Sequence, residues 1–307
     1  MLKSSDLAET ANGKRKIVLA GATGFIGSAL LERYTARGCD VRMISRRPGH
    51  LSWDDSAAIV EALNGAEMLV NLAGRSVNCR YNERNRREIL TSRTETTRIL
   101  GEAIAACPNP PELWINSSTA TIYRDARDRP MTEADGEIGN GFSVQVAQDW
   151  EEAFFAADTP QTRKAALRIA IALGRGGGVM VPYANLVRFG LGGPQGPGSQ
   201  RFSWIHLEDL LRIVDFLAER RDLSGVFNVS APEQVTNKEQ MEIMRRAYGR
   251  RIGLPAPAWM LELGAVFIRT ETELILKSRW VQPERLLQEG FEFRYPTLRE
   301  AMAEIAR

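Results

Sequence analysis

The amino-acid sequence predicts an α/β protein in which a doubly wound parallel sheet of the Rossmann type is followed by a small mixed C-terminal lobe. Short apolar runs typical of buried strands alternate with helical patterns, which favours a parallel sheet with helices on both faces. A Gly-x-x-Gly-x-x-Gly triplet stands between the first strand and the first helix. We expect a disordered lead-in at residues 1–14, a Rossmann domain at 15–230 and a substrate lobe at 231–307.

The first 173 residues predict most of the sheet. Residues 17–20 form an apolar run that ends at Gly21, as in a strand buried on both faces. The helix that follows is expected to end at Gly38, a residue suited to a helix C-terminus. The expected strands are 17–20, 39–45, 67–72, 113–116 and 166–173, and the expected helices are 28–37, 82–106 and 145–157.

Glycine and proline dominate residues 174–203, which hold nine glycines and three prolines. This density argues against regular structure and predicts a long loop on the substrate side of the domain. Residues 204–217 are typical of a strand and then a helix, with Asp209 as the expected N-cap. Capping-box patterns predict helices that open at Thr236 and Thr297. The remaining expected elements are strands at 226–229 and 291–295 and helices at 257–268 and 283–289.

Composition excludes several classes of partner. The 40 basic and 38 acidic residues leave a formal charge of only +2, and the arginines of residues 80–93 alternate with glutamates, so nucleic acid is not indicated. The three cysteines (Cys39, Cys79 and Cys107) and two histidines suggest neither a disulfide framework nor a metal site, and they favour a reducing cytoplasm. No secretory signal or bilayer-spanning stretch is recognisable. A homo-oligomer is compatible with the sequence.

The glycine triplet predicts a dinucleotide site at the first turn from strand to helix. A pyrophosphate can lie there against the free amides of the helix N-terminus, and side chains at the glycines would block its approach. A tight turn without a ligand is the alternative, but the flanking strand and helix favour binding. The expected cofactor residues of this turn are Gly21, Ala22, Thr23, Gly24, Phe25, Ile26 and Gly27.

The end of the second strand predicts which dinucleotide is bound. Binders of NAD place an acidic residue there for the ribose 2′-hydroxyl. This chain has Ser45, Arg46 and Arg47 instead, and two guanidiniums suit the 2′-phosphate of NADP(H). Two solvated surface arginines are the alternative interpretation.

Several segments together resemble the extended or atypical short-chain dehydrogenase/reductases, and most closely their epimerase-family subgroup with a C-terminal domain of unknown function. The segments are GATGFIG at 21–27, Asn71–Gly74, Ser92-Arg93-x-x-x-Thr97, Asn116–Thr119, FSWIHxxD at 202–209 and the C-terminal 283–301. The resemblance covers residues 15–305. It implies an NADP-binding sheet domain with further cofactor contacts at Leu72, Ala73, Gly74 and Ser92, and a C-terminal substrate lobe.

The acid–base pair usual in that superfamily is missing from this chain. Its members use a Tyr-x-x-x-Lys helix in which the lysine lowers the pKa of the tyrosine. None of the six tyrosines here is followed by a lysine at that spacing, and Ser143 and Ala147 stand where the pair belongs. Ser118 keeps the serine position, and we consider it, Tyr123 and His206 as catalytic candidates against purely structural roles.

Arg75, Arg201 and Trp204 are candidates, with Ser118, for contact with an anionic or planar substrate. The alternatives are loop arginines and a tryptophan of the interior. Three functions remain open: an NADP-dependent oxidoreductase or epimerase-like enzyme with an unconventional proton donor, a non-catalytic NADP(H)-binding sensor or scaffold, and a sheet domain that has lost its cofactor. The intact glycine triplet opposes the third, and the substrate stays unidentified.

Overall fold

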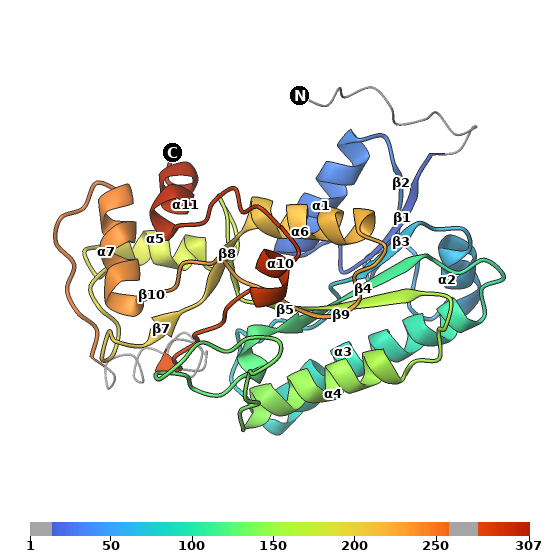
Figure 1. Ribbon diagram of the computed structural model, residues 1–307, viewed down its shortest axis with the longest axis horizontal. Helices are drawn as coiled ribbons and strands as arrows, with labels where there is room; N and C mark the ends of the chain where they lie inside the picture. Colours follow the sequence, from blue (N-terminus) through green and yellow to red (C-terminus); the bar gives the residue numbers. More distant parts are fainter. Residues whose placement is uncertain (1–13, 258–275) are drawn as a thin grey trace.

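The computed structural model describes residues 14–257 and 276–307. Its centre is a six-stranded sheet in the order β2-β1-β3-β4-β5-β9, in which every neighbouring pair is parallel (Figure 1). The strands are β1 (Lys16–Ala20), β2 (Asp40–Ile44), β3 (Met68–Asn71), β4 (Leu113–Thr119), β5 (Arg163–Ile169) and β9 (Gly225–Val229). The predicted doubly wound parallel sheet is confirmed.

Helices cover both faces of this sheet (Figure 1). They are α1 (Phe25–Ala36), α2 (Ser56–Leu63), α3 (Glu83–Ala105), α4 (Phe142–Ala156) and α6 (Leu207–Glu219). Alternate residues of a strand point to opposite faces. Ile17 and Leu19 therefore pack with α1 and α6, whereas Val18 and Ala20 pack with α2, α3 and α4. Burial on both faces explains why this run contains no polar residue.

Two smaller sheets lie outside the main one. One pairs β6 (Ile171–Leu173) with β8 (Trp204–His206) in parallel, and the other pairs β7 (Arg201–Phe202) with β10 (Val235–Thr236) in antiparallel. Residues of α5 (Met180–Arg188), α7 (Asn237–Ala247) and α11 (Leu298–Ile305) share one apolar cluster with them. The predicted capping boxes of Thr236 and Thr297 open α7 and α11. The other elements of the described residues are α10 (Glu284–Gln288) and the short 3-10 helix η1 (Ala120–Ile122).

The predicted strand 166–173 is in fact two strands, and the predicted loop 174–203 is not free of regular structure. The chain leaves the main sheet at Ala170, and the N–H of Ile171 donates to the carbonyl oxygen of Ser203, between β7 and β8. Residues 174–203 contain α5 and β7. A Cβ at Gly174 or Gly177 would come within 2.9 or 2.4 Å of the Phe25 ring, so packing on α1 requires these glycines.

Asp209 is not the N-cap of α6, contrary to the prediction. His206 is the cap, and its Nδ1 accepts the N–H of Glu208 at 3.1 Å. Asp209 is fully buried in the first turn of the helix, where its carboxylate accepts the N–H groups of Arg294 at 2.7 Å and Tyr295 at 2.8 Å.

The predicted strand at 291–295 is also wrong. Its alternating aromatics do face the core, but the segment pairs with Asp209 rather than with a strand. The sequence prediction also missed α2, whose N-cap is Asp55. The predicted helix 257–268 falls, apart from its first residue, outside the described residues.

We expect the substitution Asp209→Ala to lower the free energy of unfolding by about 2 kcal/mol, because it leaves two partly buried main-chain N–H groups without their acceptor. Urea unfolding followed by circular dichroism measures the change. Asp222→Ala is the control, since that exposed carboxylate pairs only with Arg220 among the interactions described. Equal losses in the two variants would contradict the role given to Asp209.

Candidate functional site

A cleft of about 520 Å³ opens at the carboxyl ends of β1, β2 and β3, beside the Gly21–Gly27 turn. This is the edge at which α/β sheets of this kind bind ligands. We call it the glycine-loop cleft. Its lining residues are Gly21, Thr23, Gly24, Ile44, Ser45, Arg46, Arg47, Trp53, Leu72, Ala73 and Gly74.

The three glycines of the turn serve different purposes. Gly21 has φ +80°, and a Cβ there would lie 2.7 Å from the carbonyl carbon of Leu72. A Cβ at Gly27 would lie 2.4 Å from the carbonyl oxygen of Gly21. At Gly24 the nearest atom would be 3.6 Å away. Packing of the chain therefore requires Gly21 and Gly27, whereas Gly24 leaves room for a ligand.

Gly24 is also the N-cap of α1, and no side chain caps this helix end. The first amides of a helix have no partner within the helix, and they carry a partial positive charge. A phosphate group fits such a position. The expectation that all three glycines keep space for phosphate is thus corrected to Gly24 alone, with Phe25 packed sideways against the 174–178 segment.

Arg46 and Arg47 lie at the mouth of the glycine-loop cleft, just after β2. Both are exposed, and neither forms an ion pair with any carboxylate in the described part of the chain. Arg42 on the same strand pairs with Asp40 instead. The Ser45 hydroxyl accepts the N–H of Arg47 at 2.9 Å, which fixes the turn that carries the two guanidiniums. Their charges are available to a phosphate.

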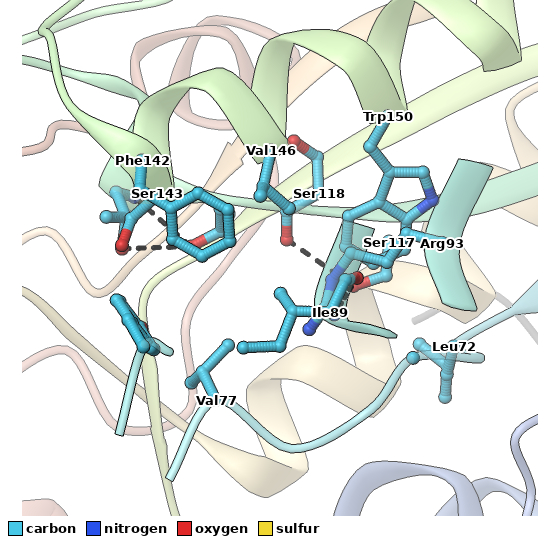
Figure 2. Close-up of a pocket in the computed structure, with 14 residues that line it drawn as sticks. Leu72, Val77, Ile89, Arg93, Ser117, Ser118, Phe142, Ser143, Val146 and Trp150 are labelled. Atoms are coloured by element: carbon cyan, nitrogen blue, oxygen red, sulfur yellow. Dashed lines mark hydrogen bonds between the residues drawn. The ribbon is translucent and has the colours of Figure 1, made fainter. Parts of the chain in front are cut away.

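A second cavity of about 220 Å³ adjoins the first, because Leu72 and Gly74 line both. We call it the inner pocket (Figure 2). Residues of β4, α3 and α4 supply most of its walls. They are Leu72, Gly74, Val77, Tyr81, Ile89, Arg93, Ser117, Ser118, Thr119, Thr121, Phe142, Ser143, Val146 and Trp150.

Ser118 points from β4 toward a buried ion pair. Its hydroxyl donates to Oε1 of Glu151, on α4, at 2.6 Å. Arg168, on β5, holds the same carboxylate in a forked geometry, with Nε 2.8 Å from Oε1 and Nη2 2.7 Å from Oε2. Both charged side chains are only 11% exposed. The pair places the Glu151 carboxylate directly behind the Ser118 hydroxyl.

The sequence prediction missed both members of this pair. Arg168 follows the apolar residues Ala165–Leu167 of β5, and Glu151 lies beside Trp150 on the buried face of α4. The available signal was a charged residue next to buried apolar residues in each of the two segments. Only the fold shows that the two charges meet.

Tyr123 lies behind the ion pair rather than in the inner pocket. It is 2% exposed, and its hydroxyl accepts a hydrogen bond from Nη1 of Arg168 at 2.8 Å. The same hydroxyl lies 2.8 Å from Oδ1 of Asn228. Burial raises the pKa of Tyr123, although Arg168 opposes the shift. These contacts indicate that Tyr123 orients Arg168.

His206 is remote from both cavities. As the N-cap of α6 it accepts an N–H at Nδ1, and its Nε2 lies 3.2 Å from the Glu304 carboxylate. The ring also packs against Tyr295, with centroids 4.0 Å apart. Burial lowers the pKa of His206, so the neutral form that can cap the helix is favoured. The structure thus separates His206 from Ser118.

The other predicted substrate residues do not line the inner pocket either. Arg75 is bound to Glu88 and Asn85, and Arg201 stacks on Trp280 with its Cζ 4.4 Å from the ring centroid. Trp204 is fully buried in the cluster shared by α5, α7 and α11, so it cannot stack on a substrate.

Ser92 supports the loop after β3 without reaching the cleft itself. Its hydroxyl accepts the N–H of Arg75 at 2.9 Å. Of residues 231–307, none of the described ones lines the inner pocket, so a substrate role for that lobe stays a prediction. Within residues 14–257 and 276–307, no helix is long and apolar enough to cross a bilayer, and no three His, Cys, Asp or Glu side chains are grouped to hold a metal.

Comparison with known proteins identifies relatives over nearly the full chain. Epimerase family protein SDR39U1 of Homo sapiens is 36% identical over 297 residues, which cover 94% of this chain and 99% of that protein. Epimerase family protein YfhF of Bacillus subtilis (strain 168) is 29% identical over 303 residues, which cover 94% of this chain and 97% of that protein.

Solved structures also match nearly the full length of this chain. The crystal structure of the human protein (isoform 2) with NADPH superposes with a TM-score of 0.86 at 36% identity, covering 94% of this chain and 98% of that one. The crystal structure of the nucleoside-diphosphate sugar epimerase from Corynebacterium glutamicum superposes with a TM-score of 0.76 at 28% identity. The match covers 96% of this chain but only 58% of the epimerase.

Two family descriptions divide the sequence between them. Residues 256–305 match a domain of unknown function, DUF1731, and residues 17–230 match the NAD dependent epimerase/dehydratase family. The resemblance inferred from the sequence motifs is confirmed. The chain belongs to the NAD dependent epimerase/dehydratase family.

Proposed function

We propose that this protein is an NADP(H)-dependent oxidoreductase that acts on a small molecule held in the inner pocket. One observation carries the proposal. Leu72 and Gly74 line both the glycine-loop cleft and the inner pocket, where the Ser118 hydroxyl donates to the Glu151 carboxylate. The human relative solved with NADPH supports the choice of cofactor.

The residues of the glycine-loop cleft fit NADP(H) in three places. The N-terminus of α1 at Gly24 would hold the pyrophosphate, and Arg46 and Arg47 would hold the 2′-phosphate. The loop of Leu72, Ala73 and Gly74 leads from there toward the inner pocket. When bound, the cofactor supplies or accepts a hydride.

Ser118 and Glu151 provide a route for the accompanying proton. A substrate hydroxyl beside Ser118 would give its proton to the Ser118 oxygen while Ser118 passes its own proton to Glu151. Reduction of a carbonyl runs the same route in reverse. Arg168 holds Glu151 in place, so the route needs neither a catalytic tyrosine nor a lysine.

A second candidate function is a non-catalytic NADP(H) sensor. Ser143 lines the inner pocket at the position expected for the catalytic tyrosine, and Ala147, where the lysine belongs, is fully buried. For either function we retain a reducing cytoplasm as the expected location, since Cys39, Cys79 and Cys107 are free thiols. The oligomeric state stays a prediction to be measured.

We expect Arg46→Ala and Arg47→Ala each to weaken NADPH binding by about 10- to 150-fold, because each removes a charge-assisted contact worth about 1.5–3 kcal/mol. Binding of NADH, which lacks the 2′-phosphate, should change little. Isothermal titration calorimetry with both cofactors measures the difference. Arg42→Ala is the matched control, because Arg42 lies on β2 and pairs with Asp40. Loss of NADH and NADPH binding in equal measure would rule out the 2′-phosphate assignment.

We expect Gly24→Val to abolish NADPH binding while the chain stays folded, because the added side chain enters the cleft rather than the protein interior. Gly24→Ala should have a smaller effect in the same direction. Enhancement of NADPH fluorescence measures binding, and thermal melting checks the fold. Undiminished binding by Gly24→Val would show that the pyrophosphate lies elsewhere.

We expect Ser118→Ala to lower kcat/KM by about 10²- to 10⁴-fold, the usual effect of removing a proton-transfer group. NADPH affinity should not change. Turnover is followed as NADPH consumption with a panel of small carbonyl compounds. Ser117→Ala is the control, since Ser117 lines the same pocket without a bond to Glu151. Tight NADPH binding without turnover of any compound would favour the sensor.

A further inference from the structure

Arg93 holds a fixed position in the wall of the inner pocket. Its guanidinium stacks on Trp150, with Cζ 5.1 Å from the ring centroid. Nη1 donates to the carbonyl oxygen of Ile89 at 2.8 Å, and Nη2 donates to that of Arg75 at 3.1 Å. A Cβ at Gly74 would lie 3.1 Å from Cζ, so the glycine makes room for the guanidinium.

Among the described residues, the charge of Arg93 has no counter-ion. Its hydrogen-bond partners are neutral carbonyls, and no carboxylate of residues 14–257 or 276–307 forms an ion pair with it. Arg168, behind the same pocket, is neutralised by Glu151. Burial lowers the pKa of Arg93 to about 10, which leaves it charged at neutral pH. A partly buried cation without a partner is unfavourable unless a ligand supplies the negative charge.

The other walls indicate the size and character of that ligand. In the view of Figure 2, Ser118 lies between Phe142 on one side and Arg93 with Trp150 on the other. Ile89 and Val146 add apolar surface. The pocket volume of about 220 Å³ lies below the roughly 300–1,000 Å³ of sites for drug-sized ligands. A small molecule with an apolar part and one anionic group fits this lining.

We propose that the substrate is a small carboxylic acid that also carries the reacting carbonyl or hydroxyl group, and that Arg93 binds its carboxylate while Ser118 contacts the reacting oxygen. This inference rests on the proposed function. A single guanidinium favours a monoanionic carboxylate, whose two oxygens match its forked donors, over a phosphate dianion. Arg93 takes over the anion-binding role that the sequence analysis gave to Arg75 and Arg201.

Calorimetry of the full chain saturated with NADP⁺ tests the proposal. The probes are straight-chain 2-oxo and 3-oxo acids of small size, each paired with its uncharged methyl ester. We expect the acids to bind at least about tenfold more tightly than their esters. Arg93→Gln should abolish this preference, and Arg93→Lys should retain part of it. Thermal melting and NADPH affinity of both variants should match those of the unaltered protein.

The possible failures can be told apart. Equal binding of acids and esters, binding of neither, or an acid preference that survives in Arg93→Gln would overturn the role of Arg93. A tenfold loss of NADPH affinity in Arg93→Gln would assign this guanidinium to the cofactor and overturn the proposal as well. Turnover of esters that depends on Ser118 would leave the proposed function standing. Failure of the unaltered protein to bind NADPH would refute the proposed function itself.

Discussion

The buried ion pair of Glu151 and Arg168 is the constraint on which the candidate site depends. It joins α4 to β5 and places a carboxylate behind Ser118 of β4, so three elements are fixed at one point. Removing one member of a buried pair typically costs about 3–5 kcal/mol, because the remaining charge has no partner. The pair is therefore both a structural link and the source of the carboxylate that accepts the Ser118 hydrogen bond.

The second constraint is the close approach of two loops. Gly21 lies against the main chain of Leu72 so tightly that no Cβ fits between them. This contact brings the turn after β1 and the loop after β3 together, and the Leu72–Gly74 loop then borders both cavities. A ligand in the glycine-loop cleft would consequently lie next to the inner pocket. The adjacency of the two cavities depends on a main-chain contact that only glycine permits.

The sequence predicted those features that depend on neighbouring residues. Apolar runs located the strands, and the triplet of Gly21, Gly24 and Gly27 located the cleft. It failed where a partner is distant along the chain. Glu151 and Arg168 are separated by the loop between α4 and β5. Asp209 accepts hydrogen bonds from Arg294 and Tyr295, which lie near the end of the chain. An alternating segment such as 291–295 looks the same whether its N–H groups bond to a strand or to a buried carboxylate.

Arginines that pair with a carboxylate differ in role from those that do not. Arg168, like Arg33 between α1 and α6, has a carboxylate partner and joins elements of the fold. Arg46, Arg47 and Arg93 face the two cavities without such a partner in the part of the chain that the structure describes. Unpaired cations stand at the mouth of the glycine-loop cleft and in the wall of the inner pocket. The electrostatics therefore suit two anionic groups, a 2′-phosphate at the outer end and a substrate carboxylate at the inner one.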